Sequence, residues 1–438
     1  MSTMPESPAV KCKDADVVIV GGGPAGSTAA ALLASAGRDV VLFEKEVFPR
    51  FHIGESLLPF NLDLFRRLGI IDRLGDCFVH KFGAQLIAGG GSIQRYIKFQ
   101  DGIIPGHPMA FHVLRSQFDE MLLRNAQQKG ARVHEGFSVV DFVASYRDGC
   151  EVTARGRDGS VMRVRGRFLF DASGRDALIA SRRKLRNMTP HLRKAAVFAH
   201  YEGVYRAEGR RGGDIVLVIL RNGWIWMIPL AEGRTSVGLV TDGSIVKESS
   251  LPPEELLGET LRRCPAAAER MAGARRISQV WSASDYSYVC REMAGDGYLL
   301  MGDAAAFIDP VFSTGVWLGM SSAEMAADTV HRSLSSPDPE ALAPAAFARY
   351  EKKVRRHVRT YSQIVTSFYE PDFMDLFLQP GKRLKIRESI VSLLAGLFDP
   401  PRSVRARLWF FYTALKIHRR FRIAKPVPLP AVLEESHG

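Results

Sequence analysis

The stretch from Asp16 to Glu44 constrains the fold more than any other part of the chain. Its short β-branched run, Val17 to Val20, predicts a buried parallel strand that leads into a helix. Between the strand and the helix, the spacing G-x-G-x-x-G is formed by Gly21, Gly23 and Gly26. A second strand, Asp39 to Phe43, then ends at Glu44. This order predicts a doubly wound α/β domain that binds a dinucleotide.

Each glycine of this turn has a separate physical role. Gly21 permits the tight turn, Gly23 lets the backbone approach a pyrophosphate, and Gly26 lets the helix pack closely on the strand. The free N–H groups at the helix start would hold the phosphates. Glu44 lies at the offset expected of a carboxylate that binds an unphosphorylated adenosine ribose. The pattern alone leaves FAD, NAD and an ordinary glycine-rich loop open.

The composition indicates a globular protein of several sub-structures. The chain has 438 residues, of which 46% are hydrophobic and 24% charged. Its first residues lack the apolar core of a signal peptide, and no uncharged apolar run could span a bilayer. We therefore expect a cytoplasmic protein without stable membrane insertion. The five cysteines form no C-x-x-C pair, so we expect neither a metal site nor a disulfide framework.

The net charge of +12 favours acidic partners through long-range attraction. The basic residues follow no known nucleic-acid-binding pattern, so we expect no nucleic acid and consider an acidic carrier protein instead. A solvated basic surface is the alternative. The stretch from Arg405 to Ile423 combines aromatic and basic side chains, as a membrane-surface helix does, although packing against the domain is the favoured interpretation.

Further strands and helices follow the nucleotide-binding stretch. We expect helices over 57–68 and 113–128, with Arg115 at the start of the second, and a hairpin around the glycines at 89–91. Residues 195–242 alternate strongly and predict a mixed or antiparallel sheet. The chain from about 339 onward is helical by periodicity.

Three motifs together resemble the FAD-dependent monooxygenase superfamily of the p-hydroxybenzoate hydroxylase type. They are GGGPAG with Glu44, DASGRD at 171–176 and GDAAAFIDP at 302–310. The resemblance implies non-covalent FAD, contacted by the GxGxxG turn and by further residues of the later motifs. The additional FAD-binding residues implied in this way are Ala25, Ser56, Arg115, Gly302 and Asp303.

Two further motifs resemble the flavin-dependent halogenases. W-x-W-x-I-P begins with Trp224 and Trp226, which would form a wall between flavin and substrate together with Pro310 of the second motif. That second motif, F-x-x-P-x-x-S-x-G, ends in a segment whose backbone N–H groups would bind chloride or bromide: Ser313, Thr314 and Gly315. Taken alone, the tryptophans would be read as core packing, and Ser313 or Thr314 as a helix N-cap.

Lys81 matches the catalytic lysine of these halogenases. The resemblance implies that FADH2 from a separate flavin reductase reacts with oxygen to a C4a-hydroperoxide, and that the hypohalous acid formed from it reaches Lys81. A lysine in an enclosed apolar space would have a lowered pKa. Without the other motifs, Lys81 would be read as a surface residue at a strand edge.

One departure from the family points to a substrate class. Tryptophan halogenases carry Glu immediately before Ser-Thr-Gly, whereas this chain has Phe312. The chain therefore resembles the phenolic and pyrrolic branch, whose aromatic substrates are free or tethered to an acyl or peptidyl carrier protein. The product would belong to secondary metabolism, such as antibiotic biosynthesis. The alternatives are an FAD-dependent aromatic hydroxylase and a non-catalytic flavin-binding protein.

The resemblance also predicts the domain organisation. A discontinuous Rossmann-like FAD-binding domain would comprise residues 1–76, 111–185 and 291–335, with the halide site in its last part. A sheet-domain insertion at 77–110 and a substrate-side β-sheet at 186–290 would interrupt it, and a helical region at 336–438 would follow.

Overall fold

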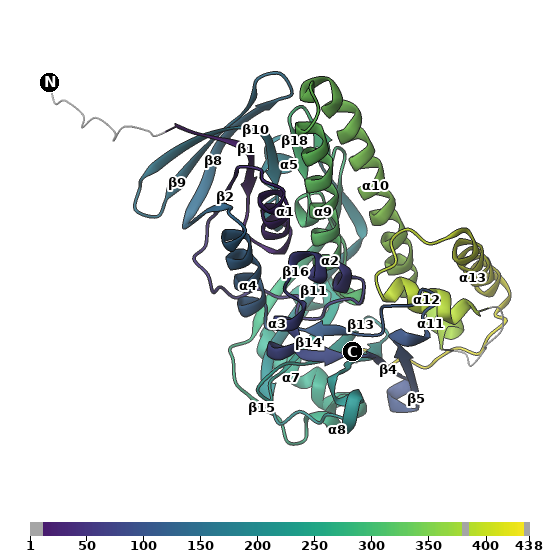
Figure 1. Ribbon diagram of the computed structural model, residues 1–438. Helices are drawn as coiled ribbons and strands as arrows, with labels where there is room; N and C mark the ends of the chain where they lie inside the picture. The colour runs from purple at the N-terminus through teal and green to yellow at the C-terminus, as the bar shows by residue number, and fades with distance from the viewer. Residues whose placement is uncertain (1–11, 379–384, 433–438) are drawn as a thin grey trace.

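The computed structural model describes residues 12–378 and 385–432, which form two large β-sheets joined by helices (Figure 1). The first sheet has a parallel centre in which Val17 pairs with Phe168 on one side and Val40 on the other. Its strand order is β17 (Ala294–Gly295), β18 (Tyr298–Leu300), β10 (Val161–Asp171), β1 (Cys12–Val20), β2 (Val40–Glu44) and β7 (Arg132–Glu135). Three separate stretches of chain supply these strands, so the predicted discontinuous Rossmann-like architecture is confirmed.

Helices and a β-ribbon surround this sheet. Helix α1 (Pro24–Ser35) packs between α4 (Arg115–Gln128) and α9 (Thr314–Leu334), and α10 (Pro339–Phe368) lies along α9. Strands β8 (Phe137–Ser145) and β9 (Gly149–Gly156) extend antiparallel from β10. The remaining short helices of this half are α2 (Asn61–Leu68), α3 (Ile71–Cys77) and α5 (Leu178–Arg182).

Two helices begin later than the sequence pattern predicts. Helix α2 starts at Asn61 rather than at residue 57, because the Leu57 N–H donates to the Phe111 carbonyl of a neighbouring strand. Helix α4 starts at Arg115 rather than at residue 113, since the Val113 N–H donates to the Glu55 carbonyl. Tertiary hydrogen bonds therefore hold both approaches to these helices in extended form.

The second sheet is antiparallel except for one parallel pair, β12 with β4, so of the predicted alternatives, a mixed or an antiparallel sheet, it is the mixed one. Its order is β19 (Ala306–Phe307), β16 (Trp281–Cys290), β11 (Arg186–Glu202), β14 (Thr235–Asp242), β13 (Gly223–Pro229), β12 (Ile215–Leu220), β4 (Gly83–Ala88) and β5 (Ile93–Lys98), with β15 (Arg275–Arg276) beside β11. The glycine turn at 89–91 joins β4 to β5, and a separate pair combines β3 (Val79–Lys81) with β6 (Ala110–His112).

The second sheet has a buried core on each face. Along β13, Trp224 and Trp226 point into the large core shared with the first sheet, whereas Ile225 and Met227 point into a smaller core. This alternation follows from the two-residue period of a strand. The helices on the side of the smaller core are α6 (Gly243–Glu248), α7 (Pro253–Arg263) and α8 (Pro265–Met271).

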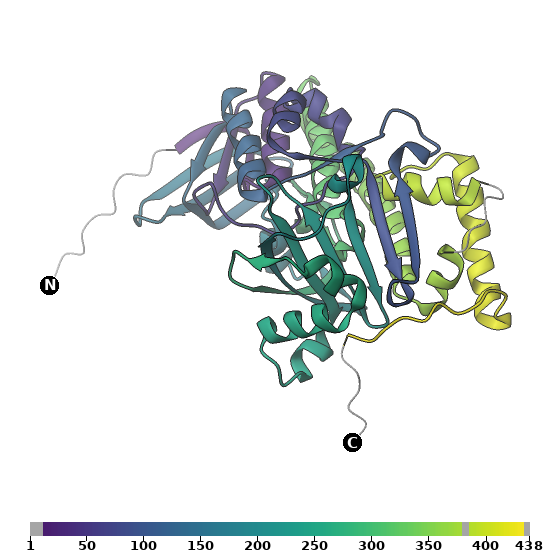
Figure 2. The same ribbon diagram turned by 90° about the horizontal axis from the view of Figure 1, so that it is seen from below.

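The C-terminal region is helical, as predicted, and lies beside the β4–β5 edge of the second sheet (Figure 2). After α10 it contains α11 (Pro371–Phe377), α12 (Ile386–Leu394) and α13 (Arg402–Phe421). The Arg95 side chain donates to the Leu378 carbonyl at 2.8 Å, and Arg387 donates to the Tyr96 carbonyl at 2.6 Å. In the described part of the chain, no helix is both long and apolar enough to cross a membrane.

Candidate active site

Two positions at the junction of β1 and α1 leave room only for glycine. Gly21 has a φ of +101°, and a Cβ there would lie 2.3 Å from the Ala172 carbonyl oxygen. A Cβ on Gly26 would lie 1.9 Å from the oxygen of Gly21. Helix α1 begins without an acidic residue in its first turn. The Glu44 carboxylate accepts hydrogen bonds from the N–H groups of Gly22 at 2.6 Å and Glu46 at 2.8 Å.

A second glycine contact brings the GD motif to the same helix. Gly302 has a φ of +57°, and a Cβ there would lie 3.1 Å from the Gly319 Cα atom and 3.5 Å from the Ala25 Cβ atom. Burial raises the pKa of the Asp303 carboxyl to about 6, although Arg175 and Arg115 oppose the change. The structure therefore gathers Ala25, Gly302 and Asp303 at one place.

Arg115 holds the loop that precedes α2. Its guanidinium donates to both carboxylate oxygens of Asp119, at 2.7 and 2.9 Å, and to the Ile53 carbonyl at 2.6 Å. Arg50 donates to the same carboxylate at 3.0 Å. A charge-assisted network of this kind fixes backbone as well as side chains, so the loop around residues 50–57 has a defined position.

Lys81, on β3, is buried within this arrangement. Only 2% of the residue is exposed, and its Nζ atom donates to Ser56 Oγ at 2.8 Å and to the Leu57 carbonyl at 3.2 Å. The Phe99 ring centroid lies 5.1 Å from Nζ. Burial lowers the pKa of the Lys81 amine to about 7, and the negative charge of Asp214 opposes part of that change. The structure thus places Ser56 beside the lysine.

The sequence analysis missed two buried residues near Lys81. The buried Asp214 carboxylate accepts from the N–H groups of Phe82 at 2.7 Å and Gly83 at 2.6 Å, which fixes the chain just after the lysine. His112, on β6, has no exposed surface, and among the described residues neither ring nitrogen has a hydrogen-bond partner. Burial, followed by the Lys81 charge, lowers the pKa of this imidazole well below its usual value. No local motif marks either residue.

The two tryptophans of W-x-W-x-I-P lie on the same face of β13. Their ring centroids are 5.7 Å apart, and both residues are buried. Trp226 donates to Ser236 Oγ at 3.0 Å and lies across Gly238, where a Cβ would be 2.3 Å from the indole. Glycine is therefore required at position 238 to leave room for the Trp226 ring.

The F-x-x-P-x-x-S-x-G segment forms the start of α9. Ser313 has a φ of +57° at the N-cap, yet its side chain makes no capping hydrogen bond to the described residues. Thr314 is buried as the first residue of the helix, and a Cβ on Gly315 would meet open space. Pro310 begins a short 3-10 turn just before this helix.

A hydrogen-bonded chain joins this segment to the tryptophan wall. Trp224 Nε1 donates to the Tyr369 hydroxyl at 2.9 Å, and that hydroxyl donates to the Asp309 carboxylate at 2.8 Å. Burial raises the pKa of Asp309 to about 6, while the Tyr369 hydrogen bond opposes the rise. Asp309 occupies an unspecified position of the motif, so the sequence pattern did not single it out.

A second buried pair lies next to Ser56. Glu55 is 1% exposed and its Oε1 atom lies 2.8 Å from His200 Nε2, whereas Oε2 is buried without a partner among the described residues. Phe51 stacks on Trp281 with a 4.2 Å centroid distance. Through Phe198, which lies 5.5 Å from Trp281 and 5.7 Å from Trp226, these aromatic side chains connect the loop beside Lys81 with the tryptophan wall.

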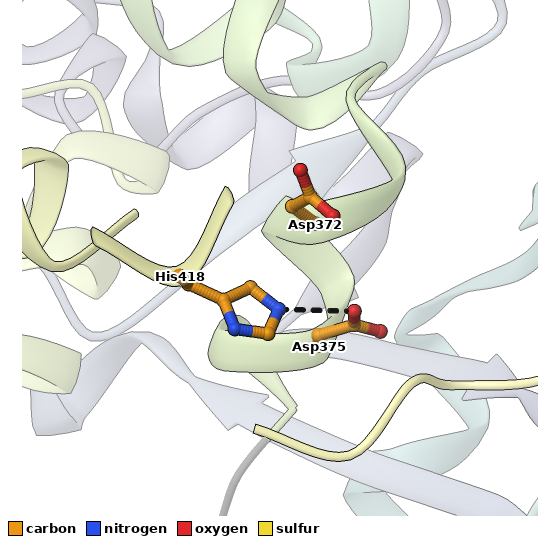
Figure 3. Close-up of side chains that lie close together, drawn as sticks. All are labelled: Asp372, Asp375 and His418. Carbon is orange, nitrogen blue, oxygen red and sulfur yellow. Dashed lines mark hydrogen bonds and ion pairs between the residues drawn. The ribbon is translucent and has the colours of Figure 1, made fainter. Parts of the chain in front are cut away.

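One cluster has the composition of a metal site. Oxygen and nitrogen atoms of Asp372, Asp375 and His418 lie within 4.8 Å of one another (Figure 3). However, Asp375 is bound by His418 at 3.1 Å and by the Val427 N–H at 2.7 Å. The other nitrogen of His418 accepts from the Ala424 N–H at 3.2 Å. These contacts explain the cluster as a clip that fastens the end of α13 to α11.

The comparisons with known proteins agree with this geometry. The FAD binding domain family matches residues 14–359. A tryptophan 2-halogenase from Chondromyces crocatus is 36% identical over 81% of this chain and 67% of its own length. The chain belongs to the flavin-dependent halogenases.

Other relatives of this halogenase cover more of its length. The 1H-pyrrole-2-carbonyl-[peptidyl-carrier protein] chlorinase of Pseudomonas fluorescens is 29% identical over 91% of this chain and 96% of its own. The structure of the flavin-dependent brominase Bmp2 aligns with a TM-score of 0.82 and 26% identity, over 93% of this chain and all of that one.

The residues present in the halogenase fit FAD. The glycine cradle and the open α1 N-terminus suit a pyrophosphate. Glu44 is a buried carboxylate beside that turn, with lone pairs beyond the two that its backbone contacts use. The unpartnered Oε2 atom of Glu55 adds an acceptor that a bound group could satisfy.

Proposed function

We propose that this halogenase chlorinates or brominates an electron-rich aromatic ring, a phenol or a pyrrole, that is free or tethered to a carrier protein. The observation that carries the proposal is the buried Lys81 amine. Since its pKa is about 7, a large fraction is neutral at physiological pH, and only the neutral amine has a lone pair to offer an electrophilic halogen.

The proposed chemistry divides between two places in the site. Held by the glycine turn and Glu44, reduced FAD from a separate flavin reductase would supply, with oxygen, the oxidising equivalent for the conversion of halide to hypohalous acid. The backbone N–H groups around Thr314 and Gly315, at the positive end of α9, would hold the halide. Trp224 and Trp226, whose ring centroids lie 5.7 Å apart on one face of β13, would keep the aromatic substrate away from the flavin.

Lys81 would then carry the halogen. Its nitrogen attacks the halogen of hypohalous acid, so that an N–halogen bond forms, the halogen–oxygen bond breaks and the hydroxide leaves as water with an amine proton. The aromatic ring next attacks the halogen: a carbon–halogen bond forms, the N–halogen bond breaks and the ring proton returns to the amine. Hydrogen bonds to Ser56 and Leu57 would orient the nitrogen for both steps.

The substrate class rests on Phe312 and on one of the relatives, whereas another relative is named for tryptophan. Phe312 packs edge-on against Phe368 with a 5.2 Å centroid distance, so no carboxylate from this position is available to deprotonate an indole. Phenols and pyrroles are activated by their own hydroxyl or ring nitrogen. One full-length relative is named for a carrier-bound pyrrole, which supports that form of substrate.

Product analysis tests the proposal. Purified protein with FAD, a flavin reductase, NADH and chloride or bromide is offered simple phenols, pyrroles and indoles, and the products are measured by mass spectrometry. We expect a mass shift with a halogen isotope pattern on a phenol or pyrrole. Lys81→Ala should still bind FAD and consume oxygen but lose at least about a hundredfold in product.

Lys98→Ala provides the matched control, because this lysine is exposed on strand β5. It should form product at the wild-type rate. A hydroxylated product, or normal halogenation by Lys81→Ala, would contradict the proposal.

A further inference from the structure

Helix α13 carries apolar side chains on two opposite faces. Its buried face packs Val404, Leu408, Phe411 and Leu415 into the large core. The opposite face exposes Trp409 (69%), Phe410 (47%), Ile417 (45%) and Phe421 (70%). Most exposed large apolar side chains of the described residues are scattered over the surface, whereas these four lie on one helix. Such a patch marks a contact with another molecule.

Cations surround this patch. Arg402, Arg405, Lys416 and Arg420 are exposed, and α13 contains no acidic residue. Within residues 12–378 and 385–432, none of these four forms an ion pair. By contrast, Arg422, just after the helix, pairs with Asp372. We call the four apolar and four basic side chains the α13 surface.

The charge pattern selects the partner. A second copy of the chain in a two-fold interface would bring the same surface onto itself, and cations would face cations. An acidic protein with a few apolar side chains offers both complementary charge and complementary apolar area.

The position of α13 relates the surface to Lys81. Helix α13 packs on α12, and α12 contacts the chain near Lys81: Ser392 Oγ accepts from the Ile103 N–H at 2.7 Å. The Phe99 ring, beside Lys81 Nζ, belongs to the short turn that α12 also contacts. The α13 surface therefore lies on the outer side of the helices that cover this end of the site.

We propose that the α13 surface is the docking site of an acidic carrier protein, which presents the aromatic ring to Lys81 on a flexible arm. This inference rests on the proposed function in its carrier-tethered form. The contacts between α11 and the end of α13 support it: His418 binds Asp375 (Figure 3), and Arg422 donates to Asp372. They fix the end of α13 and so orient the surface before a partner binds.

The test compares carrier-bound and free substrate. The FAD-loaded enzyme is given a pyrrole-2-carbonyl peptidyl carrier protein or free pyrrole-2-carboxamide, and kcat and KM for halogenation are measured. We expect the triple variant Arg405→Glu/Lys416→Glu/Arg420→Glu to raise KM for the loaded carrier about tenfold or more. Its kcat and KM for the free ring should stay at the wild-type values. The control Lys129→Glu/Arg147→Glu/Lys247→Glu makes the same charge change at exposed positions elsewhere and should alter neither.

Binding is measured separately from turnover, by titrating the loaded carrier into each variant. Equal affinity of the wild type and the α13 variant would overturn the inference, as would an equal loss with both substrates. Halogenation of the free ring without any carrier binding would overturn the docking site and leave the halogenase proposal standing. Attachment to anionic vesicles through α13, with no affinity for the carrier, would assign the surface to membranes instead.

Discussion

At the scale of single residues, Lys81 is a buried lysine whose amine must be reactive in the proposed chemistry. Burial destabilises its charged form and thereby supplies the neutral amine that the proposed chemistry needs. The negative charge of Asp214 partly opposes this decrease in the Lys81 pKa. The Asp214 carboxylate itself accepts hydrogen bonds from two backbone N–H groups and from the Tyr96 hydroxyl. The site thus keeps a carboxylate close to the lysine without giving it a direct ion pair.

This burial has a measurable effect on stability. The pKa of Lys81 is about 7 in the folded chain, whereas an unburied lysine has a pKa of 10.5. Between pH 7 and pH 10.5 the unfolded chain therefore binds more protons than the folded chain. The free energy of unfolding of the wild type consequently rises with pH in this range. Lys81→Met lacks this component. We expect its stability relative to wild type to be on the order of 3 kcal/mol more favourable at pH 7 than near pH 10. Urea unfolding at pH 7, 8, 9 and 9.5 measures it, and a difference independent of pH would contradict the burial of the charge.

At the scale of elements, three segments meet at Asp309. Strand β13 contributes Trp224, the end of α10 contributes Tyr369, and the turn before α9 contributes the carboxylate itself. The C-terminal helices therefore hold the tryptophan wall and the predicted halide segment in a common position. Removal of the Tyr369 hydroxyl should therefore break hydrogen bonds that link all three elements.

Tyr369→Phe tests this coupling. It removes a donor from a buried carboxylate and the acceptor of Trp224 Nε1, so we expect a loss of about 1–3 kcal/mol in unfolding free energy at pH 7.5. The loss should be smaller at pH 5, below the Asp309 pKa of about 6, because the protonated carboxyl needs the donor less. Tyr412→Phe is the control, since the Tyr412 hydroxyl has no hydrogen bond to the described residues. Equal losses in both variants, or a loss independent of pH, would contradict the coupling.

Elements set by local pattern could be predicted, and those set by distant contacts could not. The strand, glycine turn and helix around Gly21 follow from residues next to one another. Helix α2 could not be bounded, because its start depends on a hydrogen bond to Phe111. Lys81 could be named from a motif, but its surroundings are set by distant residues. Ser56, which accepts from Lys81, lies 25 positions before it, and Asp214, which accepts from the Phe82 N–H, lies 132 positions after Phe82. His112, Glu55 and His200 carry no local signal.

At the scale of the whole molecule, one large core joins the two sheets and the C-terminal helices. A single cluster of buried side chains includes Val17 in the first sheet, Trp224 in the second and Leu415 in α13. The nucleotide-binding half, the tryptophan wall and the C-terminal helices therefore share their main stabilising interaction, which is the burial of apolar surface.

A shared core predicts cooperative unfolding. We expect FAD release, the loss of helical circular dichroism and the change in tryptophan fluorescence to have the same urea midpoint. Leu415→Ala, at the far end of the cluster, should lower all three midpoints together, by an amount equivalent to about 2–4 kcal/mol. Loss of the C-terminal helices at a lower urea concentration than FAD release would show that α13 is an independent unit.

The interrupted first sheet has a consequence for synthesis on the ribosome. Strand β10 is complete at residue 171, and β9 already pairs with the first part of its other edge. The last part of that edge, Leu169 to Asp171, pairs with β18, which begins only at residue 298. While strands β11 to β16 of the second sheet are translated, this part of the β10 edge therefore stays unpaired in the nascent polypeptide, and Gly302 is translated later still. Products of premature termination before β18 would expose this edge and self-associate, so truncated alleles should yield inclusion bodies and not soluble apoprotein.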